Sequence, residues 1–583
     1  MRTRLRQYEI VEQLERHLGD PNDSDNLFSY RNVLEHDETE TYPQELFDVI
    51  NRWGYQQYHI PTFAGGRLVS LEQLTALSRS IARRDLTVAV ANGVCLLGSI
   101  PVWLAGTQEQ QQLVARLLSE HKKLGFALSE KEHGHDLLAN ELAAVRSQSD
   151  YVLNGYKWTV GHATRSDALS LYVRTSPGGG PRGHSMLFIN KPELNADEYH
   201  HLPKIKTLGL RAHDLSGISF DNCKVSKDTL IGQEGDGLLL ATRSTLITRS
   251  LCAGLMLGAA DTALRTTLSF AKERQLYGKS LYEIENARAI MADVLLDIYI
   301  CDCLTTATMR AWHFNTDQIS VWSPIVKYMV PTLLESSIHR LVSVLGSRFF
   351  LREELQWGLF QKIYRDVPII NVFEGGSHSQ LHGVALQLKQ LFRDRPLDQP
   401  HVQRVMSQIF TLDEPITEFI NPDRIELHSH GFNYALQFIE TTLASLPTIE
   451  TEHDRSAELN SLLRELQKQY QALQTDFNDE ARQLKDKSAK QLHYAKRYFT
   501  LHTAATCFYM WHFNRDRIDA FFEQGLWLEK ALRKLLFNET LICSQSIDLI
   551  AQQLERRLLD EQSFGIVPIQ FAKSLKSEGV TYA

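Results

Sequence analysis

A single acid ends an apolar segment in the second half of the chain. Residues 364–377 read YRDVPIINVFEGGS, so Glu374 closes an apolar run and Gly375 and Gly376 follow it. A carboxylate held at the edge of an apolar segment, with flexible glycines behind it, can serve as a general base. The same pattern also fits a solvated loop acid, so the interpretation depends on the residues that surround Glu374.

A second polar stretch, residues 125–136, reads GFALSEKEHGHD. Ser129 and the glycine-containing turn after it bring a hydroxyl and main-chain N–H groups to one place. Such a turn can hydrogen-bond a heteroaromatic ring edge or a phosphate, and it is equally common in ordinary loops. Two histidines and their neighbouring acids match no standard ligand spacing, so we expect no metal site.

The secondary structure expected around these stretches changes along the chain. Residues 1–123 read as helical, with apolar residues at helical spacing from Leu71 to Ile81 after a capping Ser70. Residues 124–232 read as a small sheet domain, and helical patterns resume over 233–395. The predicted fold class is therefore mainly α with a small β-domain.

Several strands are expected in the sheet domain. Asn154-Gly155, between β-prone flanks, predicts a hairpin turn inside residues 151–158. The glycine-rich segment 176–183 lacks the Gly-Lys-Ser/Thr ending of a phosphate loop, so we interpret it as a β-hairpin loop. The strands expected beside these turns are Leu169–Thr175, Met186–Asn190, Gly217–Phe220 and Val225–Ile231.

A polar, proline-bearing segment at 393–400 marks a boundary, and residues 396–583 form a helical extension. Two series with a spacing of seven predict a buried helical seam. They are Leu459, Leu466 and Leu473, and Leu463, Tyr470, Phe477 and Leu484. Charges of both signs over 456–495 favour packing against protein rather than against a membrane.

Composition narrows the class of protein. The chain has 583 residues, 43% of them hydrophobic, and a net charge of −8. It has no basic tract, so we expect no nucleic-acid partner. Seven scattered cysteines fit reduced thiols in the cytoplasm. The first residues fit neither a secretory signal nor a transit peptide, and we expect no apolar run of transmembrane length.

The order of these elements and six groups of motifs resemble the acyl-CoA dehydrogenase family over roughly residues 40–392. The motifs are ALSE at 127–130 with GHD at 134–136, NGYK at 154–157, LGLR at 208–211 with Asp214, AKERQLYGK at 271–279, Leu345-Gly346 with YRD at 364–366, and FEG at 373–375. The resemblance implies a helical domain (1–123), a middle β-domain (124–232), a four-helix bundle (233–395) and an added helical domain (396–583).

The resemblance further implies FAD-dependent α,β-dehydrogenation of an acyl thioester. In the family, a glutamate removes the α-proton while the flavin N5 takes the β-hydride. Glu374 is the residue that matches this position. A dry pocket would raise the pKa of its carboxyl and improve it as a base. The partners implied are acyl-CoA or an acyl carrier protein thioester, electron-transfer flavoprotein or another acceptor, and a second copy of the chain in a homodimer or homotetramer.

The resemblance also implies two sets of binding residues. The flavin set is Phe126, Leu128, Ser129, Trp158, Thr159, Gly161, Arg274, Tyr277, Gly346, Ser347 and Gly376. The substrate set is His135, Thr248, Arg249 and Gly375. Arg274 is expected to reach the FAD pyrophosphate of a neighbouring subunit, a suitable role for a guanidinium fork.

Five positions depart from the family pattern. His135 replaces a hydroxyl residue that contacts the CoA arm, so an acyl carrier protein stays an alternative thioester donor. Thr159 replaces an aromatic over the flavin, and Gly161 replaces a residue that donates to N5. Ser343 and Gly376 replace a glutamine and a threonine near the flavin.

Two other functions are compatible with the same sequence. One is an oxidase-like enzyme in which oxygen accepts the electrons. The other is a non-catalytic binding or scaffold protein, which the departures at Thr159, Gly161 and Gly376 motivate.

Overall fold

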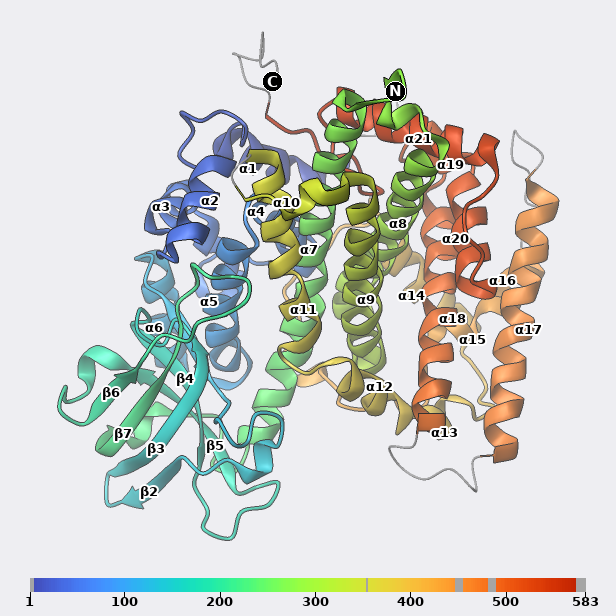
Figure 1. Cartoon of the computed structure of the whole chain (residues 1–583). Helices are drawn as coiled ribbons and strands as arrows, with labels where there is room; N and C mark the ends of the chain where they lie inside the picture. Colours follow the sequence, from blue (N-terminus) through green and yellow to red (C-terminus); the bar gives the residue numbers. More distant parts are fainter. Residues whose placement is uncertain (1–4, 353–354, 446–454, 481–488, 573–583) are drawn as a thin grey trace.

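The structure is a computed structural model that describes residues 5–352, 355–445, 455–480 and 489–572. Helices dominate it, and one sheet domain, which follows the first group of helices in sequence, lies at the lower left of the molecule beneath them (Figure 1). The mainly α fold with a small β-domain that the sequence predicts is confirmed.

The N-terminal helices are α1 (Glu9–Leu18), α2 (Tyr30–Thr39), α3 (Gln44–Trp53), α4 (Leu71–Arg84), α5 (Leu86–Ala105) and α6 (Gln108–Ser119). The expected cap at Ser70 forms, because Ser70 accepts a hydrogen bond from the Gln73 N–H. Thr107 also caps α6, through a reciprocal capping box with Gln110. Asp85 separates α4 from α5 and caps the second helix with its carboxylate.

Helix α5 corrects the expectation about apolar length. Its 20 residues are long and apolar enough, by length and composition alone, to cross a membrane. Most of the helix is nevertheless buried inside this fold, where it packs against α4, α7 and β1. Its apolar surface is therefore used in the protein core.

The sheet runs in the order β6-β7-β3-β2-β4-β5-β8, and β1 pairs in parallel with β4. The strands are β1 (Leu124–Ala127), β2 (Ala143–Ser147), β3 (Asp150–Gly161), β4 (Ala168–Arg174), β5 (His184–Asn190), β6 (Tyr199–Leu202), β7 (Leu215–Ser226) and β8 (Leu230–Ile231). β4 and β5 are antiparallel, so residues 176–183 form a hairpin loop as predicted.

The hairpin turn predicted at Asn154-Gly155 is wrong. β3 continues through these residues, and its hairpin with β2 turns at residues 148–149 instead. The register against β7 shifts between Leu153 and Gly155, and Gly155 has a φ of 128°, so the dipeptide makes a β-bulge. Asn-Gly provides the unusual backbone angles that either feature needs, so composition alone did not separate them.

The second helical group contains α7 (Gly237–Glu273), α8 (Glu285–Phe314), α9 (Ile319–Leu345), α10 (Leu355–Asp366), α11 (Pro368–Val372), α12 (Ser377–Ala385) and α13 (Leu388–Leu391). Helices α7, α8 and α9 lie side by side (Figure 1). Gly254 lets α7 approach α4 closely, since a Cβ there would come within 2.5 Å of the Thr75 methyl carbon.

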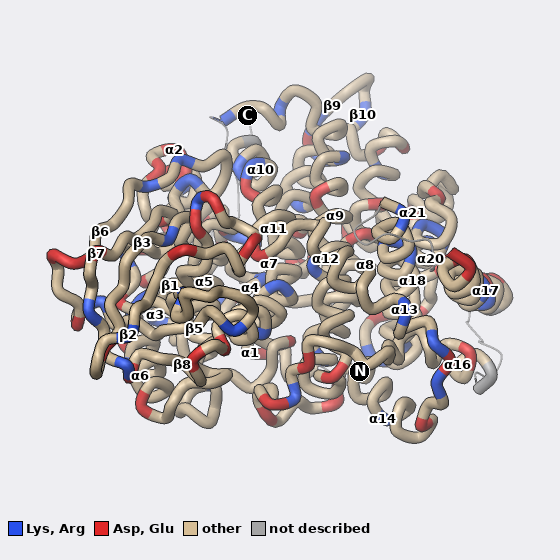
Figure 2. The backbone as a smooth tube through the Cα atoms, turned by 90° about the horizontal axis from the view of Figure 1, so that it is seen from below, with Lys and Arg blue, Asp and Glu red and all other residues tan. Residues whose placement is uncertain are grey.

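The extension contains α14 (Gln399–Phe410), α15 (Tyr434–Gln437), α16 (Ile439–Ser445), α17 (Ser456–Glu480), α18 (Ala489–Asn514), α19 (Ala520–Glu523), α20 (Leu526–Phe537) and α21 (Ser544–Leu559). The seam predicted on α17 is buried from Leu459 to Phe477, whereas Leu484 lies outside the described residues. α17 packs on α18 and α20 and carries charges of both signs (Figure 2).

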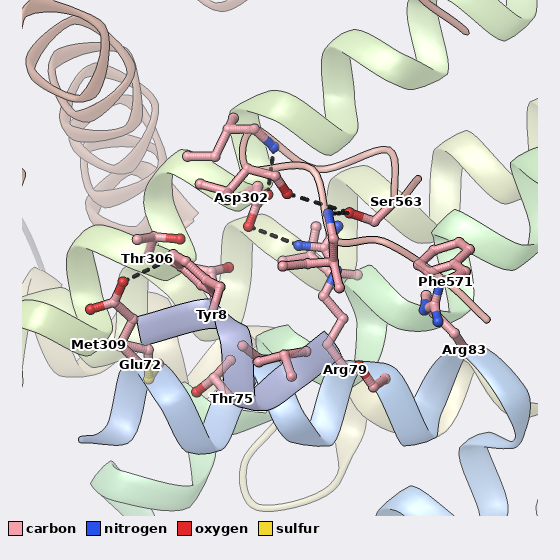
Figure 3. A pocket seen from close by; sticks show the side chains of 18 residues that line it. Tyr8, Glu72, Thr75, Arg79, Arg83, Asp302, Thr306, Met309, Ser563 and Phe571 are labelled. Atoms are coloured by element: carbon pink, nitrogen blue, oxygen red, sulfur yellow. Dashed lines mark hydrogen bonds and ion pairs between the residues drawn. The ribbon is translucent and has the colours of Figure 1, made fainter. Parts of the chain in front are cut away.

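The last described segment, residues 561–572, returns to the body and lies over α4, α7 and α8. The Phe564 N–H donates to Asp261 (2.7 Å) and the Ile566 N–H donates to Asp302 (2.8 Å). Phe571 lies against the Arg83 guanidinium at its outer end (Figure 3). We call this segment the tail. It ties the extension to the first helical group.

Candidate active site

Glu374 lies on a short loop between α11 and α12, in a backbone conformation rare for a side chain. Its φ is 56°, and that of Gly375 is 103°. The loop is held from both sides, because the Arg249 Nε donates to the Glu374 carbonyl and the Gln380 Nε2 donates to the Gly375 carbonyl (2.8 Å). A strained conformation that is fixed by its neighbours is common at functional sites.

The Glu374 carboxylate is enclosed by α7 and α9. The Thr248 hydroxyl donates to its Oε2 at 2.8 Å. Burial raises the pKa of Glu374 above its ordinary value, and Lys327, Thr248 and Arg249 only partly offset this. The carboxyl is therefore a better proton acceptor, when ionised, than an exposed glutamate.

The main-chain N–H of Glu374 finds no acceptor among the described residues. It lies in the same loop as the carboxylate. The loop therefore offers an unused donor beside a base.

This carboxylate faces a cavity of about 1070 Å³ between the sheet domain and helices α5, α7 and α11. Eleven of the residues expected at the site line it. From the flavin set these are Phe126, Leu128, Ser129, Trp158, Thr159 and Gly161, and from the catalytic and substrate sets they are His135, Thr248, Arg249, Glu374 and Gly375. The cavity thus brings together residues from four separate parts of the sequence.

The other five expected residues do not line this cavity. Arg274 caps the end of α7, Tyr277 is 94% exposed, and Gly346 and Ser347 are exposed at the end of α9. Gly376 is the N-cap of α12, directly behind Gly375. Since Arg274 is expected to act across a subunit interface, a single chain leaves that role a prediction.

The strand beside the cavity explains one departure from the family pattern. A Cβ at Gly161 would lie 2.9 Å from Val94 and 3.1 Å from the His213 ring, so a larger residue would have to displace them. Thr159 has a φ of 60°, at a second register shift of β3, and its hydroxyl donates to the Trp158 carbonyl. The Thr159 hydroxyl is therefore engaged by its own main chain.

The loop that carries Ser129 is anchored by a buried lysine, a role that was not predicted from the sequence. Lys157 Nζ donates to the Leu128 carbonyl (3.1 Å), to Glu130 (2.8 Å) and to the Asn140 side chain. Glu130 in turn accepts the Glu141 and Leu142 N–H groups. The main-chain N–H of Trp158 also donates to the Ser129 carbonyl (3.0 Å), which fixes the loop to β3.

Lys327 and His59 were also missed. Lys327 is buried in α9, donates to the Ile370 carbonyl (2.7 Å) and lies 4.3 Å from the Phe373 ring centre, so it braces the segment that leads to Glu374. A lysine inside an apolar helical run was the available signal. His59 is a buried residue of the cavity lining, and only the folded chain brings it there.

Three family models match the chain: acyl-CoA dehydrogenase N-terminal domain (29–120), middle domain (125–223) and C-terminal domain (235–389). The probable acyl-CoA dehydrogenase FadE25 of Mycobacterium leprae is 26% identical over 345 residues, 59% of this chain and 87% of that protein. The caffeyl-CoA reductase-Etf complex subunit CarC of Acetobacterium woodii is 24% identical over 59% of this chain and 89% of its own length.

Solved structures share the fold. Butyryl-CoA dehydrogenase from Megasphaera elsdenii superposes with a TM-score of 0.59 at 21% identity, covering 64% of this chain and 98% of that one. The prolyl acyl carrier protein oxidase AnaB has a TM-score of 0.59 at 17% identity, over 65% and 97% of the two chains. The three family models span most of residues 29–389, more than half of the chain. The chain belongs to the acyl-CoA dehydrogenase family of flavoproteins and is an oxidoreductase acting on CH–CH bonds.

Proposed function

We propose that this chain removes the α-proton of an acyl thioester with Glu374 and forms the 2-enoyl thioester. The observation that carries the proposal is the desolvated carboxylate, hydrogen-bonded to Thr248 and facing the cavity. The α-proton of a thioester is only weakly acidic, so a base with a raised pKa is favoured. A positioned base typically contributes ~10²–10⁴ in rate.

The loop also supports stabilisation of the negative charge that develops on the thioester oxygen. The Glu374 N–H has no partner among the described residues and can donate to that oxygen. Arg249 holds the carbonyl of the same residue, which anchors the loop that carries this N–H before substrate binds. A donor already in place needs no reorganisation during the reaction.

The cofactor proposed is FAD, which would accept the hydride from the β-carbon. The cavity suits a flavin in size, since about 1070 Å³ exceeds what a small acyl chain alone requires. Ser129, Trp158 and Thr159 line its sheet side, and Ser129 has an unpartnered hydroxyl within the described chain. The close packing around Gly161 leaves the main chain, rather than a hydroxyl, to face the ring.

The thioester carrier is proposed to be CoA, with an acyl carrier protein as the alternative. Lys131 and His135 are exposed on the loop at the cavity mouth, where either carrier would approach. The relative CarC is named as part of an Etf complex, which supports an electron-transfer flavoprotein as acceptor. A homodimer or homotetramer in the cytoplasm completes the proposal, with Arg274 reaching the neighbouring subunit.

The test is anaerobic addition of acyl-CoA and acyl carrier protein thioesters to the purified yellow holoenzyme, followed by flavin absorbance. We expect bleaching by at least one thioester. A colourless protein that takes up no flavin, or a flavin that no thioester bleaches, would contradict the proposal. Readmitting oxygen and measuring hydrogen peroxide then separates a dehydrogenase from an oxidase.

A further inference from the structure

The cavity continues past Glu374 along α7 into a closed end. Thr248, Leu251, Cys252 and Leu255 line it in sequence order along this helix. Thr248 touches the catalytic carboxylate, and Leu255 lies seven residues further on, which is ~10 Å along a helix axis. The cavity therefore has room for an extended acyl chain beyond the reacting carbons.

The direction of this chain follows from exposure. The opposite end of the cavity carries Lys131, Gly134 and His135, which are all exposed. The end at Leu255 is enclosed by α4, α5 and the short helix Tyr55–His59. A thioester that enters at the exposed loop therefore places the far end of its acyl chain beside these three elements.

The walls of this closed end are apolar. They are formed by Ala89 and Val90 of α5 and by Leu251 and Leu255 of α7. Gly93 of α5 opens directly onto the space, because a Cβ there would meet nothing within 4 Å.

The end itself is polar. His59 lines it and is 1% exposed, and neither ring nitrogen has a hydrogen-bond partner within the described chain. Nδ1 is fully enclosed by protein, so Nε2 is the nitrogen that can meet a ligand. Burial lowers the pKa of His59 to about 3, so the imidazole is neutral and its Nε2 is a donor or an acceptor according to the tautomer. The neighbouring Ser78 hydroxyl is already used, because it donates to the Leu74 carbonyl and pairs with Tyr55.

An apolar acyl chain would leave the buried ring nitrogen unpaired, which is unfavourable. We infer that the acyl substrate carries a hydrogen-bonding oxygen, a hydroxyl or a carbonyl, near its far end, and that His59 selects for it. This inference rests on the proposed function, since it takes Glu374 as the site of reaction. It concerns a different part of the cavity and can fail separately.

The test measures binding without turnover. Glu374→Gln holoenzyme is titrated calorimetrically with hexanoyl-, octanoyl-, decanoyl- and dodecanoyl-CoA, each with and without a terminal hydroxyl group. At the chain length that reaches His59, we expect the hydroxylated thioester to bind about tenfold more tightly, the size of one good hydrogen bond. A hydroxyl that enters a purely apolar pocket weakens binding instead.

Two variants and one control assign the preference. His59→Leu is expected to abolish it, and Gly93→Leu, which fills the open space without disturbing packed atoms, is expected to exclude the longer hydroxylated chains. His502→Leu is the control, because His502 is also fully buried with a pKa lowered to about 3 but lies in α18, away from the cavity. It should leave the preference unchanged.

Each outcome is decisive. Weaker binding of the hydroxylated thioester at every length, or a preference that survives both His59→Leu and Gly93→Leu, would overturn the role of His59 and leave the dehydrogenase proposal intact. No binding by any thioester, together with no bleaching of the wild-type flavin, would overturn the proposed function and this inference with it.

Discussion

Two buried groups of charge use carboxylates in opposite ways. In the cavity, Glu374 has a raised pKa because its neighbours do not fully compensate for burial. Between α1 and α4, burial also pushes the pKa of Glu15 upward, but Arg83 and Arg84 outweigh it and hold the pKa below its ordinary value. The first carboxylate is kept reactive, and the second is kept ionised.

The tail extends the second group. It adds main-chain donors to Asp261 and Asp302, and Asp302 also pairs with Arg79 at 3.0 Å (Figure 3). Arg79 and Ser78 are adjacent on α4. Arg79 lines a pocket that the tail covers, whereas Ser78 lines the cavity beside Glu374. The difference lies in compensation: two guanidinium groups outweigh the burial of Glu15, whereas the neighbours of Glu374 beside the cavity do not outweigh its burial, as is common at chemically active sites.

The largest effect is expected from Glu374→Gln. Loss of the base should slow substrate bleaching of the flavin by ~10²–10⁴, while the yellow colour is retained. Stopped-flow absorbance under anaerobic conditions measures this rate. Glu120→Gln, which changes an exposed acid at the end of α6, is the control and should keep the wild-type rate. Equal rates in the two variants would remove Glu374 from the mechanism.

Glu15→Gln should destabilise the fold instead of the reaction. Removing one partner of a buried ion pair typically costs ~3–5 kcal/mol. Denaturant unfolding measures the change, and Glu45→Gln is the control, since Glu45 is 47% exposed in its pair with His36 and should change stability by ~1 kcal/mol or less. A similar loss in both variants would contradict the distinction between the two groups.

The two groups also predict opposite behaviour with pH. The folded pKa of Glu15 is lowered, so its contribution to stability is present above its unfolded value and is lost as the pH falls through the folded pKa. The folded pKa of Glu374 is raised, so ionising it costs stability as the pH increases, while the rate of proton removal increases. Denaturant unfolding and flavin bleaching, each measured from acidic to neutral pH, should therefore differ between the wild type and the Glu15→Gln or Glu374→Gln variant.

Thr248→Val tests how the Thr248 hydrogen bond affects the pKa of Glu374. The Thr248 hydrogen bond lowers the pKa of Glu374, so its removal should move the midpoint of the pH–rate profile to higher pH. Thr248→Ser retains a hydroxyl and should restore the wild-type midpoint. An unshifted midpoint in the valine variant would show that this hydrogen bond does not reach the reacting carboxylate.

The smallest effect is expected at the tail. Phe571→Ala removes a ring 3.3 Å from the Arg83 guanidinium carbon, a contact worth ~0.5–2 kcal/mol. Thermal unfolding should detect the loss, and Phe571→Tyr should preserve most of it. Bleaching rates should stay at the wild-type value, since the tail lies across α4 from the cavity. A slower reaction with unchanged stability would link the tail to the site.

The sequence predicted the order of elements and the position of Glu374 well, because each depended on local signals. The helix cap at Ser70 and the acid before two glycines are short patterns that the fold preserved. The Asn154-Gly155 turn failed, since a β-bulge and a hairpin turn use the same backbone angles.

What could not be predicted depends on contacts between distant residues. Lys157 and Lys327 acquire their roles from partners far away in sequence, and His59 acquires its place in the cavity from the fold; one sequence does not reveal the burial of these residues. The glycine at 161 looked like a loss, yet the packing of Val94 and His213 requires it. The role expected of Arg274 depends on an interface between subunits, which a single chain does not contain.

One measurement tests the role of Glu374 most directly. Octanoyl-CoA is incubated anaerobically with the holoenzyme in deuterated water, and deuterium at its α-carbon is followed by mass spectrometry, which reports proton removal without requiring hydride transfer. We predict incorporation with the wild-type enzyme and none above background with Glu374→Gln. Equal incorporation by both proteins would contradict the assignment of Glu374 as the base.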